Sequence, residues 1–238
     1  MSLLFEDIFF QDGNITFNPS KIDSNGLKTQ KGIYNTKLSK TDGIIYFKAY
    51  QFHKGLEKDG RVSIQKAIKA GTLDSKSLLS LIMKSIMLFN KLLPLHKFDV
   101  LVTPESSAPL NKMILQVFKS KYPHIEIIPF GFVKRLGKDV TLKHDLINKL
   151  NDKTKNAVLS NLSKTLAADD WKMKGIYQPN KKFLDRVMWS TDQLKVQGKR
   201  VLVIDDVITE GTTLKDMIRI CNENGAKLSV GYIFMSEK

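Results

Sequence analysis

Two adjacent carboxylates follow an apolar run in the segment VLVIDDVITEGTT, residues 201–213. Asp205 and Asp206 are expected at the exit of a buried strand, because an unpaired charge inside a sheet would be very costly. Successive residues at a strand end point in different directions, so the pair can present a wide acidic surface. Such a surface suits sugar hydroxyls, which donate hydrogen bonds to carboxylates, and Mg²⁺, which prefers carboxylate oxygen.

The loop after the acidic pair is suited to binding phosphate. Gly211 permits a tight turn and a close approach of the backbone to a ligand. The N–H groups of the loop and of the first helical turn converge at the positive end of the helix dipole, and Thr209, Thr212 and Thr213 add hydroxyl donors. The alternative is a plain strand–turn–helix with Thr212 or Thr213 as the helix N-cap. The apolar run, the two acids and T-x-G-T-T in register favour a site for a phosphorylated sugar.

The surrounding sequence predicts a parallel sheet covered by helices on both faces. Apolar residues at helical spacing begin at Asp74 or Ser75 and stop at Pro94. Strand-like and amphipathic runs then alternate over residues 98–103, 109–122, 125–135, 200–207, 212–225 and 227–234. This alternation is typical of strands that are buried on both faces. Ligands gather at the carboxyl ends of such strands, which is where Asp205 and Asp206 would lie.

Two regions depart from this alternation. Residues 1–75 are rich in turn residues, and the short runs NITF and GIIYFKAYQF predict a small, mostly β accessory region. Residues 136–186 are rich in lysine and partly helical, without a run apolar enough for a buried strand. Two interpretations of this second region, the insertion, stay open. It is either a basic lid over the site, or a solvated segment that serves dimer contacts or no chemistry.

Composition narrows the class of protein. The 238 residues include 38 Lys and Arg against 24 Asp and Glu, a formal charge of +14. The excess indicates either a polyanionic ligand, such as a phosphate-rich small molecule or nucleic acid, or a lysine-rich bias of solvated faces. Cys221 is the single cysteine, which excludes an internal disulfide, and it is expected to be buried and inert. No apolar run is long enough for a bilayer and the N-terminus lacks a secretory signal, so the expected location is the cytoplasm.

The segment VLVIDDVITEGTT resembles the signature of the type I phosphoribosyltransferases, and the element order supports the resemblance over residues 76–238. These enzymes move ribose 5-phosphate from phosphoribosyl pyrophosphate (PRPP) onto a nitrogen nucleophile. The phrase DDVIT-x-GT is most similar to orotate phosphoribosyltransferases. The resemblance implies an α/β fold with a mostly parallel twisted sheet flanked by helices. It also implies a core at residues 76–238, a small β-rich hood at residues 1–75, and a homodimer.

The resemblance also implies roles for particular residues. Asp205 and Asp206 would hold the ribose hydroxyls, with Mg²⁺ bound nearby as the cofactor. The 5′-phosphate would be held by Thr209, Glu210, Gly211, Thr212 and Thr213. The segment TPESSAPL falls at the pyrophosphate loop, with the candidates Glu105, Ser106, Ser107 and Ala108. The segment FVKRLGKD falls where a mobile catalytic loop begins, so Lys134, Arg135 and Lys138 would face the pyrophosphate, with Lys138 as the catalytic candidate.

Several features bear on the acceptor and on how the site is completed. The residue three after the second acid is usually an aspartate in the 6-oxopurine enzymes; here it is Thr209, which favours a pyrimidine-like base. The segment TPESSAPL lacks the basic residue and the glycine that are common in relatives. The insertion is much longer than the usual mobile loop. The chain ends one strand after the signature helix, so the hood over the base is expected from residues 1–75.

The implied reaction is displacement of pyrophosphate at C1 of the ribose, through a transition state with oxocarbenium character. No side chain need act as a nucleophile, because positioning and stabilisation of the charge on pyrophosphate suffice. The second hypothesis is a PRPP- or nucleotide-sensing regulator, or a nucleic-acid-associated protein, on the same fold without turnover. Nucleic acid is thus an open but less favoured partner. A PRPP-synthesising enzyme ranks last, because the chain is short for its paired domains.

Overall fold

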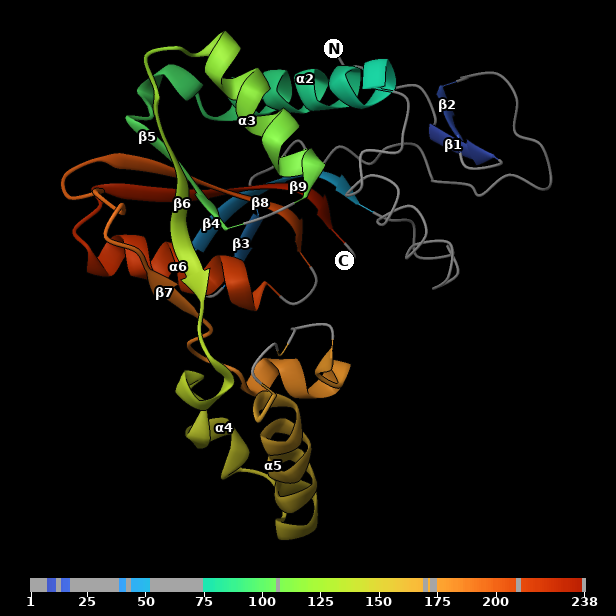
Figure 1. Cartoon of the computed structure of the whole chain (residues 1–238), viewed down its shortest axis with the longest axis vertical. Coiled ribbons are helices and arrows are strands. Elements are labelled where there is room, and N and C mark those ends of the chain that lie inside the picture. Colours follow the sequence, from blue (N-terminus) through green and yellow to red (C-terminus); the bar gives the residue numbers. More distant parts are fainter. Residues whose placement is uncertain are drawn as a thin grey trace.

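The computed structural model of the chain is shown in Figure 1. It describes residues 8–11, 14–17, 39–41, 44–51, 75–105, 108–168, 171, 175–208 and 211–236. The predicted accessory region therefore lies largely outside the described residues. Within the accessory region, the structure describes a hairpin that is separate from the main sheet. It consists of β1 (Ile8–Gln11) and β2 (Asn14–Phe17).

A mostly parallel sheet of seven strands forms the centre of the fold, which confirms the predicted α/β class. In spatial order the strands are β3 (Ser39–Thr41), β4 (Ile44–Gln51), β9 (Leu228–Ser236), β8 (Arg200–Ile208), β5 (Val100–Pro104), β6 (Glu126–Lys134) and β7 (Met188–Ser190). The five strands from β4 to β6 run parallel, and the edge strands β3 and β7 are antiparallel to their neighbours.

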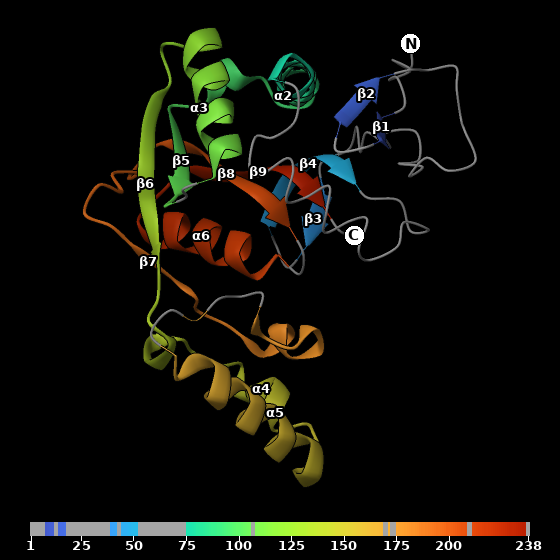
Figure 2. The same cartoon turned by 45° about the vertical axis from the view of Figure 1, so that its right-hand side comes forward.

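Three helices cover the two faces of this sheet. Helices α2 (Ser75–Leu92) and α3 (Pro109–Lys121) lie on one face, and α6 (Thr212–Glu223) lies on the other (Figures 1 and 2). Strand β8 shows why both faces are apolar, because its side chains alternate between two cores. Leu202 and Ile204 pack under α2 and α3, whereas Val201 and Val203 pack against α6. Cys221 is buried on α6, as predicted, and burial raises the pKa of its thiol to about 12.

Strands β3 and β4, which fall within the predicted accessory region, extend the main sheet. Strand β4 pairs in parallel with β9, with Phe47 opposite Tyr232, and Phe47 is almost fully buried. Without β4, strand β9 would be an edge strand with apolar residues on both faces and unpaired backbone groups. The pairing joins residues nearly two hundred positions apart, so no local pattern could indicate it.

The insertion is a helical appendage beyond the carboxyl end of β6, on the side away from α2 and α3 (Figures 1 and 2). It contains the 3-10 turn η2 (Gly137–Asp139), α4 (His144–Ile147), α5 (Asp152–Leu166) and the 3-10 segment η4 (Gln178–Phe183). Asn151 caps α5 by accepting a hydrogen bond from the Thr154 N–H at 2.9 Å. Val158, Leu162, Trp171 and Leu184 are buried in it and continue the core on the α6 side of the sheet.

A buried pair of hydroxyls in the first core gives a prediction about stability. The Ser85 hydroxyl donates to the Ile82 carbonyl at 2.8 Å and also contacts the hydroxyl of the fully buried Tyr232. We expect Ser85→Ala to cost about 1–3 kcal/mol of unfolding free energy, because the Tyr232 hydroxyl stays buried without this partner. Tyr232→Phe should cost less, since Ser85 keeps the Ile82 carbonyl. Urea unfolding measures both, and the opposite ranking would contradict this account.

No helix among the described residues combines the length and apolar character that crossing a membrane requires.

Candidate active site

The parallel register brings the predicted site segments to one edge of the sheet. Val102 of β5 lies opposite Val203 of β8, and Pro104 of β5 lies opposite Phe132 of β6. The residues that follow these positions therefore lie toward the carboxyl edge of the sheet. The segments that meet there hold Asp205 and Asp206, the loop from Glu105 to Ala108, and Lys134 with Arg135.

The acidic pair lies in the part of β8 that pairs with only one neighbouring strand. Pairing of β8 with β5 ends at Val203, whereas pairing with β9 continues to Ile208. Asp205 is half-buried and Asp206 is 9% exposed. The Asp206 N–H donates to Oδ1 of Asp205 at 2.9 Å, which orients that carboxylate. Strand β8 thus continues past the two acids. Their charges are tolerated because β5 no longer pairs with β8 at their positions.

The predicted phosphate-binding loop ends in a glycine that leaves the helix N-terminus without a side-chain cap. Gly211 is the N-cap of α6 and adopts the left-handed conformation, with φ 75° and ψ 7°. It has no side chain that can accept hydrogen bonds from the first-turn N–H groups, which remain available to an anion. The alternative with Thr212 or Thr213 as N-cap is therefore wrong, because α6 begins at Thr212. Thr209 and Glu210 lie outside the described residues.

The predicted pyrophosphate loop also leads into a helix N-terminus at this edge. Glu105 is exposed, and its N–H donates to the Phe132 carbonyl at 2.9 Å, which continues the β5–β6 pairing. Ala108 is the N-cap of α3, and Pro109 follows at the first helical position. Alanine has no acceptor in its side chain, so this N-terminus resembles that of α6. Ser106 and Ser107 lie outside the described residues.

The three predicted cations after β6 have different surroundings. Lys134 is exposed; its ammonium donates to the Trp171 carbonyl at 3.1 Å and lies 4.3 Å from the centroid of the Trp171 ring. Arg135 is only 9% exposed, and its guanidinium bonds to backbone carbonyls at the base of the insertion. Lys138 is exposed in η2. The role of these residues toward pyrophosphate stays a prediction, and Lys134 and Lys138 are the exposed ones among them.

Residues 95–237 match the family described as "Phosphoribosyl transferase domain". The chain belongs to this family. The matched range covers β5 to β9 and includes the acidic pair, the Gly211 turn and the insertion. It begins after α2, so the residues before position 95 are outside the match.

Two further proteins are similar to the chain. The "Transcriptional regulator GfcR" of Methanosphaera stadtmanae is 42% identical over 43 residues, which are 18% of this chain and 22% of that protein. The chain thus aligns with about a fifth of the length of that regulator. The crystal structure of a purine phosphoribosyltransferase from Pyrococcus horikoshii Ot3 aligns with 69% of this chain and 83% of its own, at 15% identity and a TM-score of 0.32.

The acidic pair of this phosphoribosyl transferase domain fits a magnesium ion that arrives with a phosphorylated ligand. Among the described residues, no group of three or more His, Cys, Asp or Glu could hold a metal by itself. Magnesium is commonly bound through one or two carboxylates together with substrate phosphates and water. Asp205 and Asp206 supply that donor set, beside a helix N-terminus suited to phosphate.

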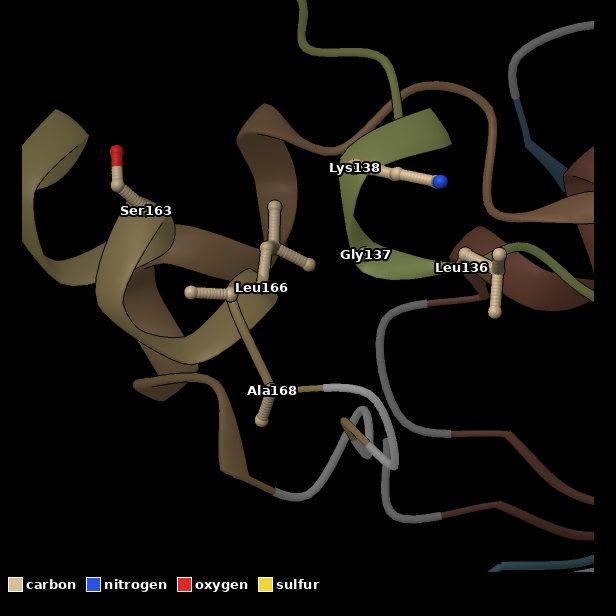
Figure 3. A pocket seen from close by; sticks show the side chains of 7 residues that line it. Leu136, Gly137, Lys138, Ser163, Leu166 and Ala168 are labelled. Carbon is tan, nitrogen blue, oxygen red and sulfur yellow. The ribbon is translucent and has the colours of Figure 1, made fainter.

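A pocket of about 370 Å³ lies where the insertion leaves the phosphoribosyl transferase core. Figure 3 shows its two walls, one from η2 and the other from the C-terminal end of α5. The lining residues are Leu136, Gly137, Lys138, Ser163, Leu166, Ala167 and Ala168. The sequence analysis selected Lys138 but did not predict the pocket. The two segments that line the pocket are about thirty positions apart in the sequence, and no pattern links them.

Gly137 is required where η2 meets α5. A Cβ at this position would lie 1.7 Å from the Leu166 carbonyl oxygen, a backbone atom that moves only with the helix. We expect Gly137→Ala to displace the end of α5 and to cost about 1–3 kcal/mol of unfolding free energy. The matched control is Gly175→Ala, whose Cβ would meet the Thr165 Cγ2 at an ordinary 3.6 Å. Equal unfolding free energies of the two variants would contradict the close contact.

Proposed function

We propose that this chain transfers the 5-phosphoribosyl group from PRPP to a nitrogen of a nucleobase or base-like acceptor and releases pyrophosphate. The observation that carries the proposal is the Gly211-capped start of α6 beside two acids at the carboxyl edge of the sheet. One feature suits a phosphate and the other suits ribose hydroxyls. The family membership of residues 95–237 supports the same reaction class.

Each element of the site would contribute to binding and positioning. Asp205 and Asp206 would accept hydrogen bonds from the ribose hydroxyls and hold C1 toward the acceptor. The start of α6 would hold the 5′-phosphate, and the start of α3 would face the pyrophosphate. Mg²⁺ would supply charge neutralisation on PRPP oxygens. Lys138 would lie over the leaving group, where cationic charge stabilises the developing pyrophosphate.

The acceptor that we favour is pyrimidine-like, because Thr209 stands where 6-oxopurine enzymes carry an aspartate. The insertion would exclude water from the activated sugar. The assembly proposed with this function is a homodimer.

The test of the function is PRPP-dependent release of pyrophosphate with orotate, uracil, adenine, guanine and hypoxanthine as acceptors. Release with a pyrimidine above the purines is expected, and no release with any base would overturn the proposed turnover.

A second candidate is a PRPP-binding regulator without turnover. The observation that favours it is the similarity to a protein named as a transcriptional regulator, over 43 residues. The formal charge of +14 is compatible with a polyanionic partner. This candidate requires DNA or RNA binding that weakens as salt rises and that changes when PRPP is added. Negligible affinity for both nucleic acids at low salt would exclude it.

A further inference from the structure

On the side of α6 that faces the edge strand β7, and not the central strands, lies a buried carboxylate. Asp216 is 2% exposed, and Ile220, one turn later on the same side, is 6% exposed. The sheet-facing side of α6 carries Leu214, Met217 and Cys221, so burial of Asp216 requires a second cover. A buried carboxylate is costly unless it is paired and hydrogen-bonded, and its partners therefore identify the cover.

The partners of Asp216 belong to the exit of the insertion. Its Oδ2 accepts hydrogen bonds from the backbone N–H groups of Val187 at 2.5 Å and of Met188 at 2.7 Å. Its Oδ1 pairs with the guanidinium of Arg219, which also lies 3.9 Å from the Asp185 carboxylate. Oδ2 of Asp216 thus holds the segment that returns from the insertion to the sheet, and Oδ1 holds Arg219, which reaches Asp185 of the same segment.

The entry of the insertion is attached to the same place by Arg135. Its Nε donates to the Met188 carbonyl at 2.9 Å, and its Nη1 donates to the Asp139 carbonyl at 3.0 Å. Its guanidinium carbon lies 3.5 Å from the centroid of the Trp189 ring, which covers it from solvent. Burial lowers the pKa of Arg135, and the negative charge of Asp216 opposes that shift. The two charges therefore attract across the base of the insertion.

Asp216 also lies close to the phosphate-binding end of its helix. It is four residues after Thr212, the first residue of α6. The first turn of α6 packs closely on the sheet, because a Cβ on Gly231 of β9 would lie 2.9 Å from the Leu214 Cδ2. The helix that begins at the phosphate-binding loop and the base of the insertion thus form one connected unit.

We propose that Asp216 is a positioning residue that fixes the base of the insertion to the helix beginning at the phosphate-binding loop. Its anchoring role stands on these contacts alone, and its effect on turnover rests on the proposed phosphoribosyl transfer. The insertion is then attached rigidly at residues 135–139 and 185–189. Any closure over PRPP takes place beyond these residues, and Lys138, at the anchored entry, keeps a fixed place relative to α6.

The experiment compares Asp216→Ala and Asp216→Asn with the wild type and with Asp192→Asn, which changes an exposed aspartate in the turn after β7. Hydrogen exchange is measured at the amides of residues 185–189, and kcat and the KM for PRPP are measured with the best acceptor. We expect exchange to be at least about tenfold faster in Asp216→Ala, kcat to fall by about tenfold or more, and the KM to change little. Asp216→Asn keeps an acceptor oxygen and should recover part of both losses.

The outcomes separate the anchoring role from the proposed function. Unchanged exchange in Asp216→Ala overturns the anchor, and faster exchange with wild-type kcat overturns the positioning role. A wild type without turnover defeats the proposed function instead, and the exchange measurement then decides the anchor alone. If Asp216→Ala does not fold, Arg219→Met removes the ion pair and leaves Oδ2 of Asp216 to accept from both N–H groups. Faster exchange is again the expected result, and no change is the contradicting one.

Discussion

The double substitution Asp205→Asn, Asp206→Asn is expected to lower kcat/KM for PRPP by about 10²–10³-fold, the usual effect of removing a main electrostatic contact in an active site. The variant keeps the shape of both side chains and removes two negative charges from the carboxyl edge of the sheet. It therefore loses the charge that would attract Mg²⁺-bound PRPP and the strong acceptors for ribose hydroxyls. Pyrophosphate release in the best-acceptor assay measures the effect.

Stability separates a functional acidic pair from a structural one. Asparagine keeps an oxygen that can accept the Asp206 N–H, so the double variant of a ligand-binding pair should keep nearly the wild-type thermal midpoint. A structural pair would show the reverse, with a lower midpoint and normal turnover. The control is Asp192→Asn, an exposed aspartate in the turn after β7. Equal turnover by the wild type and the double variant would remove the assigned roles.

Gly211→Val is expected to weaken PRPP binding strongly and to destabilise the fold. The position has φ 75°, where a side chain costs on the order of 2 kcal/mol and a β-branched one is a clear outlier. For a chain of this size, that cost lowers the thermal midpoint by roughly 4–8 °C. The new side chain would also stand at the N-terminus of α6, where the phosphate would bind. We expect the Kd for PRPP to rise by about tenfold or more.

Gly198→Val is the matched control for this substitution. Gly198 has a nearly identical φ of 71°, and nothing lies within 4 Å of a Cβ added there. It precedes β8, so it is at the opposite end of the strand from Gly211. Both variants should lose similar stability, and only Gly211→Val should lose PRPP affinity. Equal affinities for PRPP in the two variants would mean that Gly211 serves only the backbone conformation of the turn and that the turn binds no ligand.

The sheet, and the edge where the candidate site segments meet, could be predicted because their signals are local. Strand β8 is apolar on both faces, and the alternation of strands and helices around it admits few arrangements. The place of β4 was not predictable, because its pairing with β9 is fixed by register between distant segments. The strand that holds the acidic pair was predicted at residues 200–207, and β8 extends one residue further to Ile208, where β9 still pairs with it.

Sequence patterns could not predict which groups surround an individual charged residue. Arg135 follows a strand and was grouped with Lys134 and Lys138 as a phosphate-facing cation. The structure surrounds it with the Met188 carbonyl and the Trp189 ring, both supplied by a strand fifty positions later. Asp216 left one local signal, since Ile220 follows it one turn later on a different side of α6 from Leu214, Met217 and Cys221. An acidic and an apolar residue together there indicate that something covers α6 on that side.

The central claim is that two consecutive aspartates and the glycine-capped helix start behind them bind PRPP at the carboxyl edge of the sheet. Isothermal titration of PRPP into the full chain with Mg²⁺ present tests it most directly. The account predicts saturable heat at one site per chain, lost in Gly211→Val and retained in Gly198→Val. Absence of binding heat from PRPP and from ribose 5-phosphate, with a correctly folded chain, would contradict it.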